Sequence, residues 1–137
     1  MSFATPSITL THEGALAMLT AAVAKATQMG QPQCIVIVDA SGVTMAELRM
    51  TGAKFLSLKS ARAKAETAAS IRAPSNAIPE PVQPLIGLAT QGHVTGLPGG
   101  LPIMLDGICV GGIGVGSGSG DQDIEVAKAA LDAIGAT

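Results

Sequence analysis

The chain has 137 residues, of which 47% are apolar and only 13% are charged. This length suits a single domain spanning residues 1–137, and the apolar content excludes an intrinsically disordered protein. A net charge of −2 and only two aromatic residues, Phe3 and Phe55, exclude the basic, base-stacking surfaces of nucleic-acid-binding proteins. So weakly charged a surface predicts that part of it is covered by self-association into a homo-oligomer.

The N-terminal residues Met1–Leu10 contain no lysine, no arginine and no long apolar stretch, so we expect no signal peptide. No segment approaches the ~18 consecutive apolar residues of a membrane span. Cys34 and Cys109 lie in separate apolar segments without a CxxC spacing. They are predicted to be buried, reduced thiols of a cytoplasmic protein, the alternative being a disulfide or a reactive thiol.

Helical spacing of apolar residues predicts a first helix over Glu13–Met29. The β-branched run Gln33–Asp39 predicts a buried strand, and a short turn connects it to a second predicted strand, Val43–Met50. Two strands joined so closely favour an antiparallel hairpin. A second predicted helix, Ala53–Ile71, follows and carries several lysines and arginines.

The second half of the chain begins with Ala73–Pro84, whose four prolines predict an irregular loop, followed by a helical turn at Leu85–Thr90. Leu101–Leu105 and Ile108–Val115 flank an Asp-Gly pair and predict a second hairpin. A last helix is predicted to begin at Asp121. These elements indicate an α+β protein with an antiparallel sheet, one face of which is covered by helices.

The segment Gly111–Gly120 (GGIGVGSGSG) is rich in glycine. It lacks the Gly-Lys-Ser/Thr of a P-loop and the GxGxxG of a dinucleotide-binding turn, so nucleotide binding is not expected. Glycines in a strand allow another backbone, or a flat ligand, to approach closely. Two interpretations therefore stay open, namely close packing within the fold and contact with a ligand.

Six basic residues and one acidic residue lie between Arg49 and Arg72, whereas acidic residues predominate from Asp106 onwards. The basic stretch is interpreted either as a solvated helix face, able to pair with another protomer, or as a carboxylate-binding rim. In the second case Arg49 and Lys64 would hold acid groups, and Lys64 or Asp121 could move protons. No nucleophile–base arrangement is evident, so the sequence leaves open whether the protein is an enzyme.

His12 and His93 are the only histidines. Two histidines so far apart in the chain do not predict a zinc site. A single axial histidine suffices to hold haem iron, so each is a candidate haem-iron ligand. The alternative for each is an ordinary surface residue.

Three segments carry longer motifs, namely VDASGVTMAELRMTGA at Val38–Ala53, KAETA at Lys64–Ala68 and LPGGLPIMLDGICVGGIGVGSGSGDQD at Leu97–Asp123. Together they resemble the GlcG/HbpS family, whose domain also forms the C-terminal part of PduO-type proteins. The third segment matches the family's Pro-Gly-Gly-x-Pro-Ile, Asp-Gly and Gln-Asp pattern. The similarity extends over roughly residues 8–135.

This resemblance implies a profilin-like fold, in which helices pack against a five-stranded antiparallel sheet. It also implies assembly into oligomers, and some members of the family bind haem. The candidate ligand-binding residues, which match recurring positions of the motifs, are Arg49, Lys64, Gly99, Gly100 and Asp121. The two histidines are candidates from their chemistry alone.

Three functions follow from these observations. The first is an oligomeric protein that binds haem or a related tetrapyrrole, with Arg49 or Lys64 meeting propionates and a histidine meeting iron. The second is an enzyme or accessory protein that acts on a small oxo or hydroxy acid. The third is a structural assembly protein without a ligand.

Overall fold

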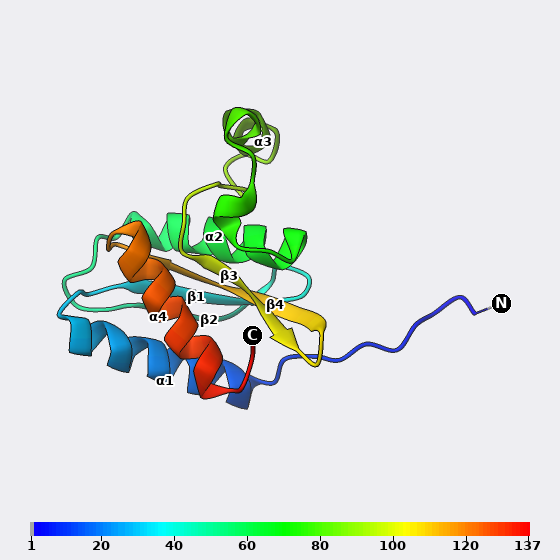
Figure 1. The fold of residues 1–137 in the computed structure, drawn as a ribbon, viewed down its shortest axis with the longest axis horizontal. Coiled ribbons are helices and arrows are strands. Elements are labelled where there is room, and N and C mark those ends of the chain that lie inside the picture. Colours follow the sequence, from blue (N-terminus) through cyan, green and yellow to red (C-terminus); the bar gives the residue numbers. More distant parts are fainter. Residues whose placement is uncertain (1) are drawn as a thin grey trace.

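The computed structural model describes residues 2–137. Within them the chain forms four helices and four strands, and two single-turn 3-10 helices at Ser75–Ala77 and Glu80–Val82 precede α3 (Figure 1). The bounds of the elements are α1 His12–Met29, β1 Cys34–Asp39, β2 Thr44–Arg49, α2 Ser57–Ile71, α3 Gln83–Ala89, β3 Gly100–Leu105, β4 Ile108–Gly116 and α4 Gly120–Ala133. Each helix and strand predicted from the sequence is present.

The strands of the sheet follow the order β2-β1-β4-β3, and every neighbouring pair is antiparallel. Both predicted hairpins are confirmed, since β1 pairs with β2 and β3 pairs with β4. The expectation of five strands is wrong, because the sheet within residues 2–137 has four. The chain between α2 and β3, which could have supplied another strand, is broken by prolines that cannot donate to a sheet ladder. These prolines are Pro74, Pro79, Pro81, Pro84 and Pro98.

Helices cover both faces of the sheet, so the expectation of one covered face is also wrong. α2 packs on one face, and α1 and α4 pack together on the other (Figure 1). Strand β1 shows the reason, because its side chains are buried on both sides. Ile35 and Ile37 belong to the core formed with α1 and α4, whereas Val36 and Val38 belong to the core formed with α2. A continuous apolar run is typical of a strand that has no solvent-exposed face.

Helices α2 and α4 begin close to the glycine-rich segment, and they begin differently. α4 starts with a capping box, in which the Ser119 hydroxyl accepts from the Gln122 N–H at 3.2 Å and the Gln122 side chain accepts from the Ser119 N–H at 2.9 Å. α2 has no side-chain cap at Leu56. Instead, the N–H groups of residues 57–59 donate to the carbonyls of residues 54–56, which satisfies the first turn of α2.

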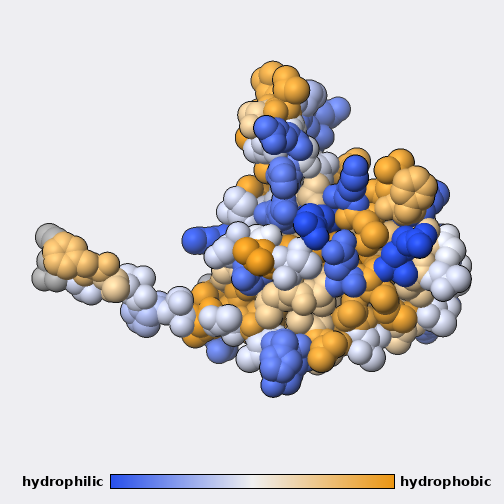
Figure 2. Space-filling view, turned by 180° about the vertical axis from the view of Figure 1, so that it is seen from behind, coloured by the Kyte–Doolittle hydropathy of each residue, from blue (hydrophilic) through white to orange (hydrophobic). Residues whose placement is uncertain are grey.

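Residues 73–99 form an arm that projects from the layered body and carries α3 (Figure 1). The buried Ser75 closes the base of the arm, since its hydroxyl donates to the Leu97 carbonyl at 2.6 Å and accepts from the Gly100 N–H at 3.0 Å. Leu85 and Leu88 are exposed on α3, and Figure 2 shows the apolar tip of the arm. None of the helices in the described chain combines the length and the apolar character needed to cross a membrane.

Candidate functional site

Strand β4 brings its glycines against α2. A Cβ atom at Gly112 would overlap the carbonyl oxygen of Ala65, and a Cβ atom at Gly114 would overlap that of Ala61. The residue between them, Ile113, belongs to the core on the opposite face. β4 therefore alternates glycine on the α2 side with large apolar side chains on the α1/α4 side. Of the two interpretations of these glycines, the structure shows close packing within the fold.

This tight packing encloses a charged pair between α2 and α4. The side chains of Lys64 and Asp123 are only 5% and 3% exposed, and Lys64 Nζ lies 3.1 Å from Asp123 Oδ2. The same ammonium donates to the Val115 carbonyl at 2.7 Å, and Asp123 Oδ1 accepts from the Gly118 N–H at 3.1 Å. Buried charges are tolerated when they are paired and hydrogen-bonded, as these are. The pair ties α2, α4 and the end of β4 together.

Gly99 and Gly100 make room for this pair. Gly99 has a φ of +119°, a conformation that favours glycine, and a Cβ atom there would lie 2.7 Å from the Val115 carbonyl oxygen and 3.1 Å from Lys64 Nζ. A Cβ atom at Gly100 would overlap the Lys64 carbonyl oxygen. The structure thus brings together three of the five candidate ligand-binding residues, Lys64, Gly99 and Gly100.

The other two candidates, Asp121 and Arg49, lie apart from this centre. Asp121 is exposed in the first turn of α4, and the carboxylate beside Lys64 is that of Asp123, two residues later. Arg49 is exposed at the end of the edge strand β2. Sequence reasoning missed Asp123 as the partner of Lys64, although the Gln-Asp that ends the third motif contained the signal.

A cavity of about 250 Å³ opens beside the charged pair, between the first turns of α2 and α4 and the end of the arm. Its polar lining consists of Lys54, Ser57, Ser60, Lys64, Ser117 and Asp123. Below the glycine-rich turn, the side chain of Gln33 is fully buried, and neither of its amide atoms has a hydrogen-bond partner within the described chain. A Cβ atom at Gly118 would lie 2.8 Å from the amide nitrogen of Gln33 and 2.9 Å from Asp123 Oδ1.

His93, at the return of the arm, lies on the outer side of α2. Its Nδ1 is 2.8 Å from Glu66 Oε2, and the side chain of Glu66 is only 20% exposed. A cavity of about 390 Å³ adjoins the pair and is also lined by Lys59 and Arg62. A second cavity of about 320 Å³ lies on the side of the β1–β2 turn and is lined by Ser41 together with the same pair. A carboxylate bonded to one ring nitrogen orients the imidazole and leaves the other nitrogen available to a metal.

His12 is in a different situation. It lies in the first turn of α1 with a side chain 81% exposed, and its Nε2 is 3.4 Å from the Glu13 carboxylate. Within residues 2–137 no group of three or more histidine, cysteine or acidic side chains is placed so that it could hold a metal ion. The structure therefore does not bring the two histidines together.

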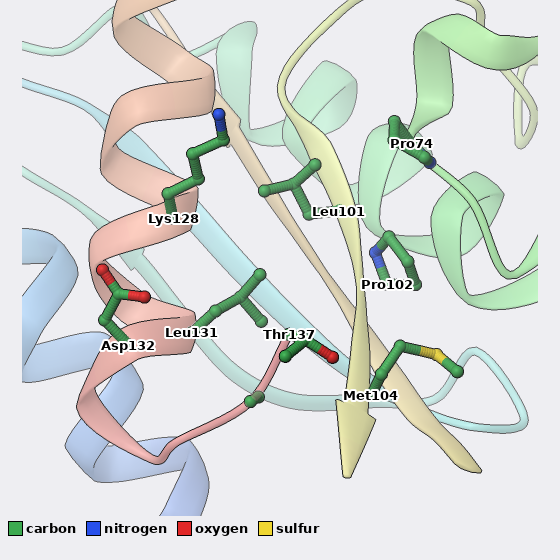
Figure 3. Close-up of a pocket in the computed structure, with 9 residues that line it drawn as sticks. Pro74, Leu101, Pro102, Met104, Lys128, Leu131, Asp132 and Thr137 are labelled. Atoms are coloured by element: carbon green, nitrogen blue, oxygen red, sulfur yellow. The ribbon is translucent and has the colours of Figure 1, made fainter. Parts of the chain in front are cut away.

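A groove of about 360 Å³ with a mainly apolar lining lies between β3 and the C-terminal half of α4 (Figure 3). Leu101, Met104 and Leu131 contribute to its walls, and Lys128 and Asp132 lie along α4 beside it. Its polar lining residues are Lys128, Asp132 and Thr137, and the rest of its wall is apolar.

Both cysteines are free thiols, so the alternative of a disulfide is wrong. Cys34 is fully buried in β1, where burial raises the pKa of its thiol above the ordinary value and keeps it protonated. Cys109, on β4, is only partly buried, and its Sγ lies 3.3 Å from the Gly111 carbonyl. The prediction of a buried, reduced thiol is thus confirmed in full for Cys34 alone.

These features define an α+β protein in which a four-stranded antiparallel sheet lies between helices, with polar cavities around α2. Residues 10–132 match the family described as haem degrading protein HbpS-like, and the chain belongs to this family. The resemblance to the GlcG/HbpS family is therefore confirmed.

The chain is 36% identical over 119 residues to the corrinoid adenosyltransferase PduO of Salmonella typhimurium. The aligned region covers 83% of this chain and 35% of PduO. The chain thus spans little more than a third of that protein. In the crystal structure of a PduOC–haem complex, the PduOC chain is 32% identical in sequence to this one. The match covers 95% of this chain and 98% of PduOC, with a TM-score of 0.88. The crystal structure of Klebsiella pneumoniae protein ORFY is 30% identical in sequence, and the match covers 100% of this chain and 98% of ORFY with a TM-score of 0.94.

Proposed function

We propose that this protein binds haem, or a related tetrapyrrole, as a homo-oligomer. The description of its family names a haem-degrading protein. PduOC, which shares the fold over nearly the whole chain, was crystallised with haem. The observation from this chain that carries the proposal is the His93–Glu66 pair. It is a histidine oriented by a carboxylate at the edge of a cavity with basic side chains.

The residues around His93 fit the group. Glu66 holds Nδ1, and the imidazole is 64% exposed, so a planar ligand can reach Nε2. Lys59 and Arg62 line the same cavity and supply positive charge for propionates. Arg62 also pairs with Glu47 at 3.1 Å, but exposed pairs of this kind are weak and exchange readily. Haem bound here would supply an iron with an open coordination position.

Two of the earlier expectations change within this proposal. Lys64 is committed to the buried pair with Asp123, so Lys59 and Arg62 take the role that was given to Lys64 and Arg49. A cavity of about 390 Å³ is near the lower end of the roughly 300–1,000 Å³ of pockets for drug-sized ligands, and a macrocycle would extend beyond it. A second copy of the chain, docking through the exposed apolar arm, would cover the remainder. Two free thiols suit the reducing cytoplasm, where we place the protein.

A haemin titration of the purified protein, followed by absorbance through the Soret band, tests the proposal. The wild type is expected to give a saturable, stoichiometric shift that His93→Ala abolishes and His12→Ala retains. Glu66→Gln is expected to weaken haem binding about 10-fold or more, because it removes the negative charge that orients and polarises the His93 imidazole. The exposed Lys128→Gln is the matched control for Lys59→Gln, which should weaken binding through the loss of a propionate contact.

A wild type without any Soret shift would overturn haem binding, and a shift that survives both histidine replacements would exclude ligation by these residues. Loss of the shift in His12→Ala alone would move the iron to the first turn of α1 and refute the assignment of His93. Light scattering of the wild type and of the double variant Leu85→Asp/Leu88→Asp tests the oligomer. The double variant is expected to dissociate, and a wild-type monomer would refute self-association.

A further inference from the structure

The cavity beside the Lys64–Asp123 pair is a second candidate binding site, independent of His93. It is formed by the first turn of α4, by residues 54–60 and by Leu97 and Pro98 at the end of the arm. Its volume of about 250 Å³ is below the range of about 300–1,000 Å³ for drug-sized ligands, so it excludes a macrocycle and admits a molecule of a few heavy atoms.

The charged residues that line the cavity determine which charge a ligand must carry. Lys64 and Asp123 neutralise each other, whereas Lys54 has no carboxylate within ion-pair distance among the residues described. Two lysines and one aspartate leave the lining with a single net positive charge. An anion that carries one charge is therefore matched, and a second negative charge would meet the Asp123 carboxylate without a further cation.

The first turn of α4 adds a directional contribution. Its capping box satisfies the N–H groups of Ser119 and Gln122, but no acceptor is present within the described chain for the N–H of Gly120, which lines the cavity. The unpaired N–H groups at the start of a helix attract anions, since the helix dipole places positive charge there. The positive end of the helix therefore lies on the same cavity as the two lysine side chains.

Three hydroxyl groups complete the polar lining, and they offer both donors and acceptors. Ser117 Oγ accepts from the Lys54 N–H at 2.9 Å, which leaves its own proton free to donate. Ser60 Oγ donates to the Ser57 carbonyl at 3.2 Å, which leaves its lone pairs free to accept. The hydroxyl of Ser57 has no partner within residues 2–137. Such a set can bind a carboxylate and also a hydroxyl or carbonyl group next to it.

The remaining wall is apolar and close. Leu97 and Pro98 face the cavity, and a Cβ atom at Gly120 would lie 2.6 Å from Pro98 Cγ, so the arm rests directly on the start of α4. This wall can cover the short carbon chain of a ligand. We propose that the cavity binds a small monocarboxylate that carries a hydroxyl or oxo group on a chain of two to four carbons.

Isothermal titration calorimetry at constant ionic strength tests this proposal, with sodium lactate and sodium pyruvate as probes and neutral lactamide as their uncharged counterpart. At least one of the two acids is expected to bind with one-to-one stoichiometry, and lactamide is not. Replacing Lys64 endangers the fold, so the test variants are Lys54→Gln and Ser60→Ala. Each is expected to raise the Kd about tenfold, which is the effect of losing one hydrogen bond to a charged group. Lys128→Gln removes an exposed lysine elsewhere and should leave the Kd unchanged.

Three outcomes would refute the site. They are no saturable binding of either acid at millimolar concentration, equal binding of lactamide, and an unchanged Kd in both test variants. Tighter binding of inorganic phosphate than of either acid would refute the monocarboxylate assignment. The haemin titration tests a different cavity, the one beside His93. If the acids fail to bind but the Soret shift is intact, the haem proposal stands. If the Soret shift is absent but an acid binds, the acid site stands.

Discussion

The two faces of the sheet hold their helices in opposite ways. On the α1/α4 face, large side chains such as Met18, Ile35 and Ile113 fill the space between the layers. On the α2 face, the glycines of β4 lie against backbone atoms of α2, and the side chains there are mainly alanine and valine. The first face is stabilised in proportion to the apolar area that it buries. The second depends on the absence of side chains at a few positions.

This difference explains where the polar centre lies. A helix that touches the sheet through its backbone has a fixed position, so a long side chain on it can be directed to defined acceptors. Lys64 is such a side chain, since its ammonium donates to one carbonyl and pairs with one carboxylate while the side chain stays buried. Adding atoms should therefore harm the α2 face most, and removing atoms should harm the α1/α4 face most.

The largest effect is expected from Gly114→Val. The new side chain would overlap the Ala61 carbonyl of α2, a backbone atom that cannot turn aside, so we expect a loss of more than about 4 kcal/mol of folding free energy. Urea denaturation followed by circular dichroism measures it. Gly87→Ala on α3 is the control, because its Cβ would lie at an ordinary 3.6 Å from the Val94 carbonyl. A folded Gly114→Val protein of wild-type stability would contradict the backbone contact.

A loss of about 3–5 kcal/mol is expected from Lys64→Met, which leaves the Asp123 carboxylate buried without its partner. Adding Asp123→Asn removes that unpaired charge, so the double variant should recover part of the loss. The same denaturation experiment, run as a double-mutant cycle, gives the coupling. If the two losses were simply additive, the charges would not be acting as a pair.

On the opposite face, Met18→Ala is expected to lower the free energy of unfolding by about 3 kcal/mol, because it removes a fully buried side chain and leaves a cavity. Leu16→Ala, on the exposed side of the same helix, should change it by no more than about 0.5 kcal/mol. Thermal and urea denaturation of both variants measures the difference. Similar losses in the two would show that α1 is not packed as described.

The smallest effect concerns the two thiols, Cys34 and Cys109, which both lie on the α2 face. Burial raises the pKa of Cys34, so the folded state favours the neutral thiol, and its contribution to stability should fall as the pH rises above about 8.5, the ordinary value for cysteine. A thiol reagent at pH 8 is expected to modify the partly buried Cys109 first. The single variants Cys34→Ala and Cys109→Ala assign the two phases, and a faster reaction at Cys34 would refute its protection.

Local patterns gave most of the fold. The Asp-Gly turn, the β-branched run before Asp39 and the spacing of apolar residues before Gly30 each depend on neighbours in the chain, and each element was found. The coverage of both faces also had a local sign in the unbroken apolar run of β1, but it was outweighed by the general rule that antiparallel hairpins expose one face.

The composition of the site depended on tertiary structure. Asp121 and Asp123 are two residues apart on a helix, which separates their side chains by about 200° around its axis, and only the docking of α4 decides which one faces Lys64. Likewise, His93 contacts Glu66 of α2 only because the arm projects from the layered body and then folds back to it. Glycines 99 and 100 were identified through their motif, although their spatial reason, the room for Lys64, was not visible in the sequence.

The hydroxyl of Ser75 makes the arm a replaceable module. The chain leaves the body and re-enters it at one side chain, so the ends of the arm are fixed whatever lies between them. The entropy of closing a loop grows slowly with its length, so this insert can be lengthened, shortened or exchanged at little expense to the body. The layered body then serves as a frame, and new specificities can evolve by changing the insert, as they do in proteins that present variable loops on a constant scaffold.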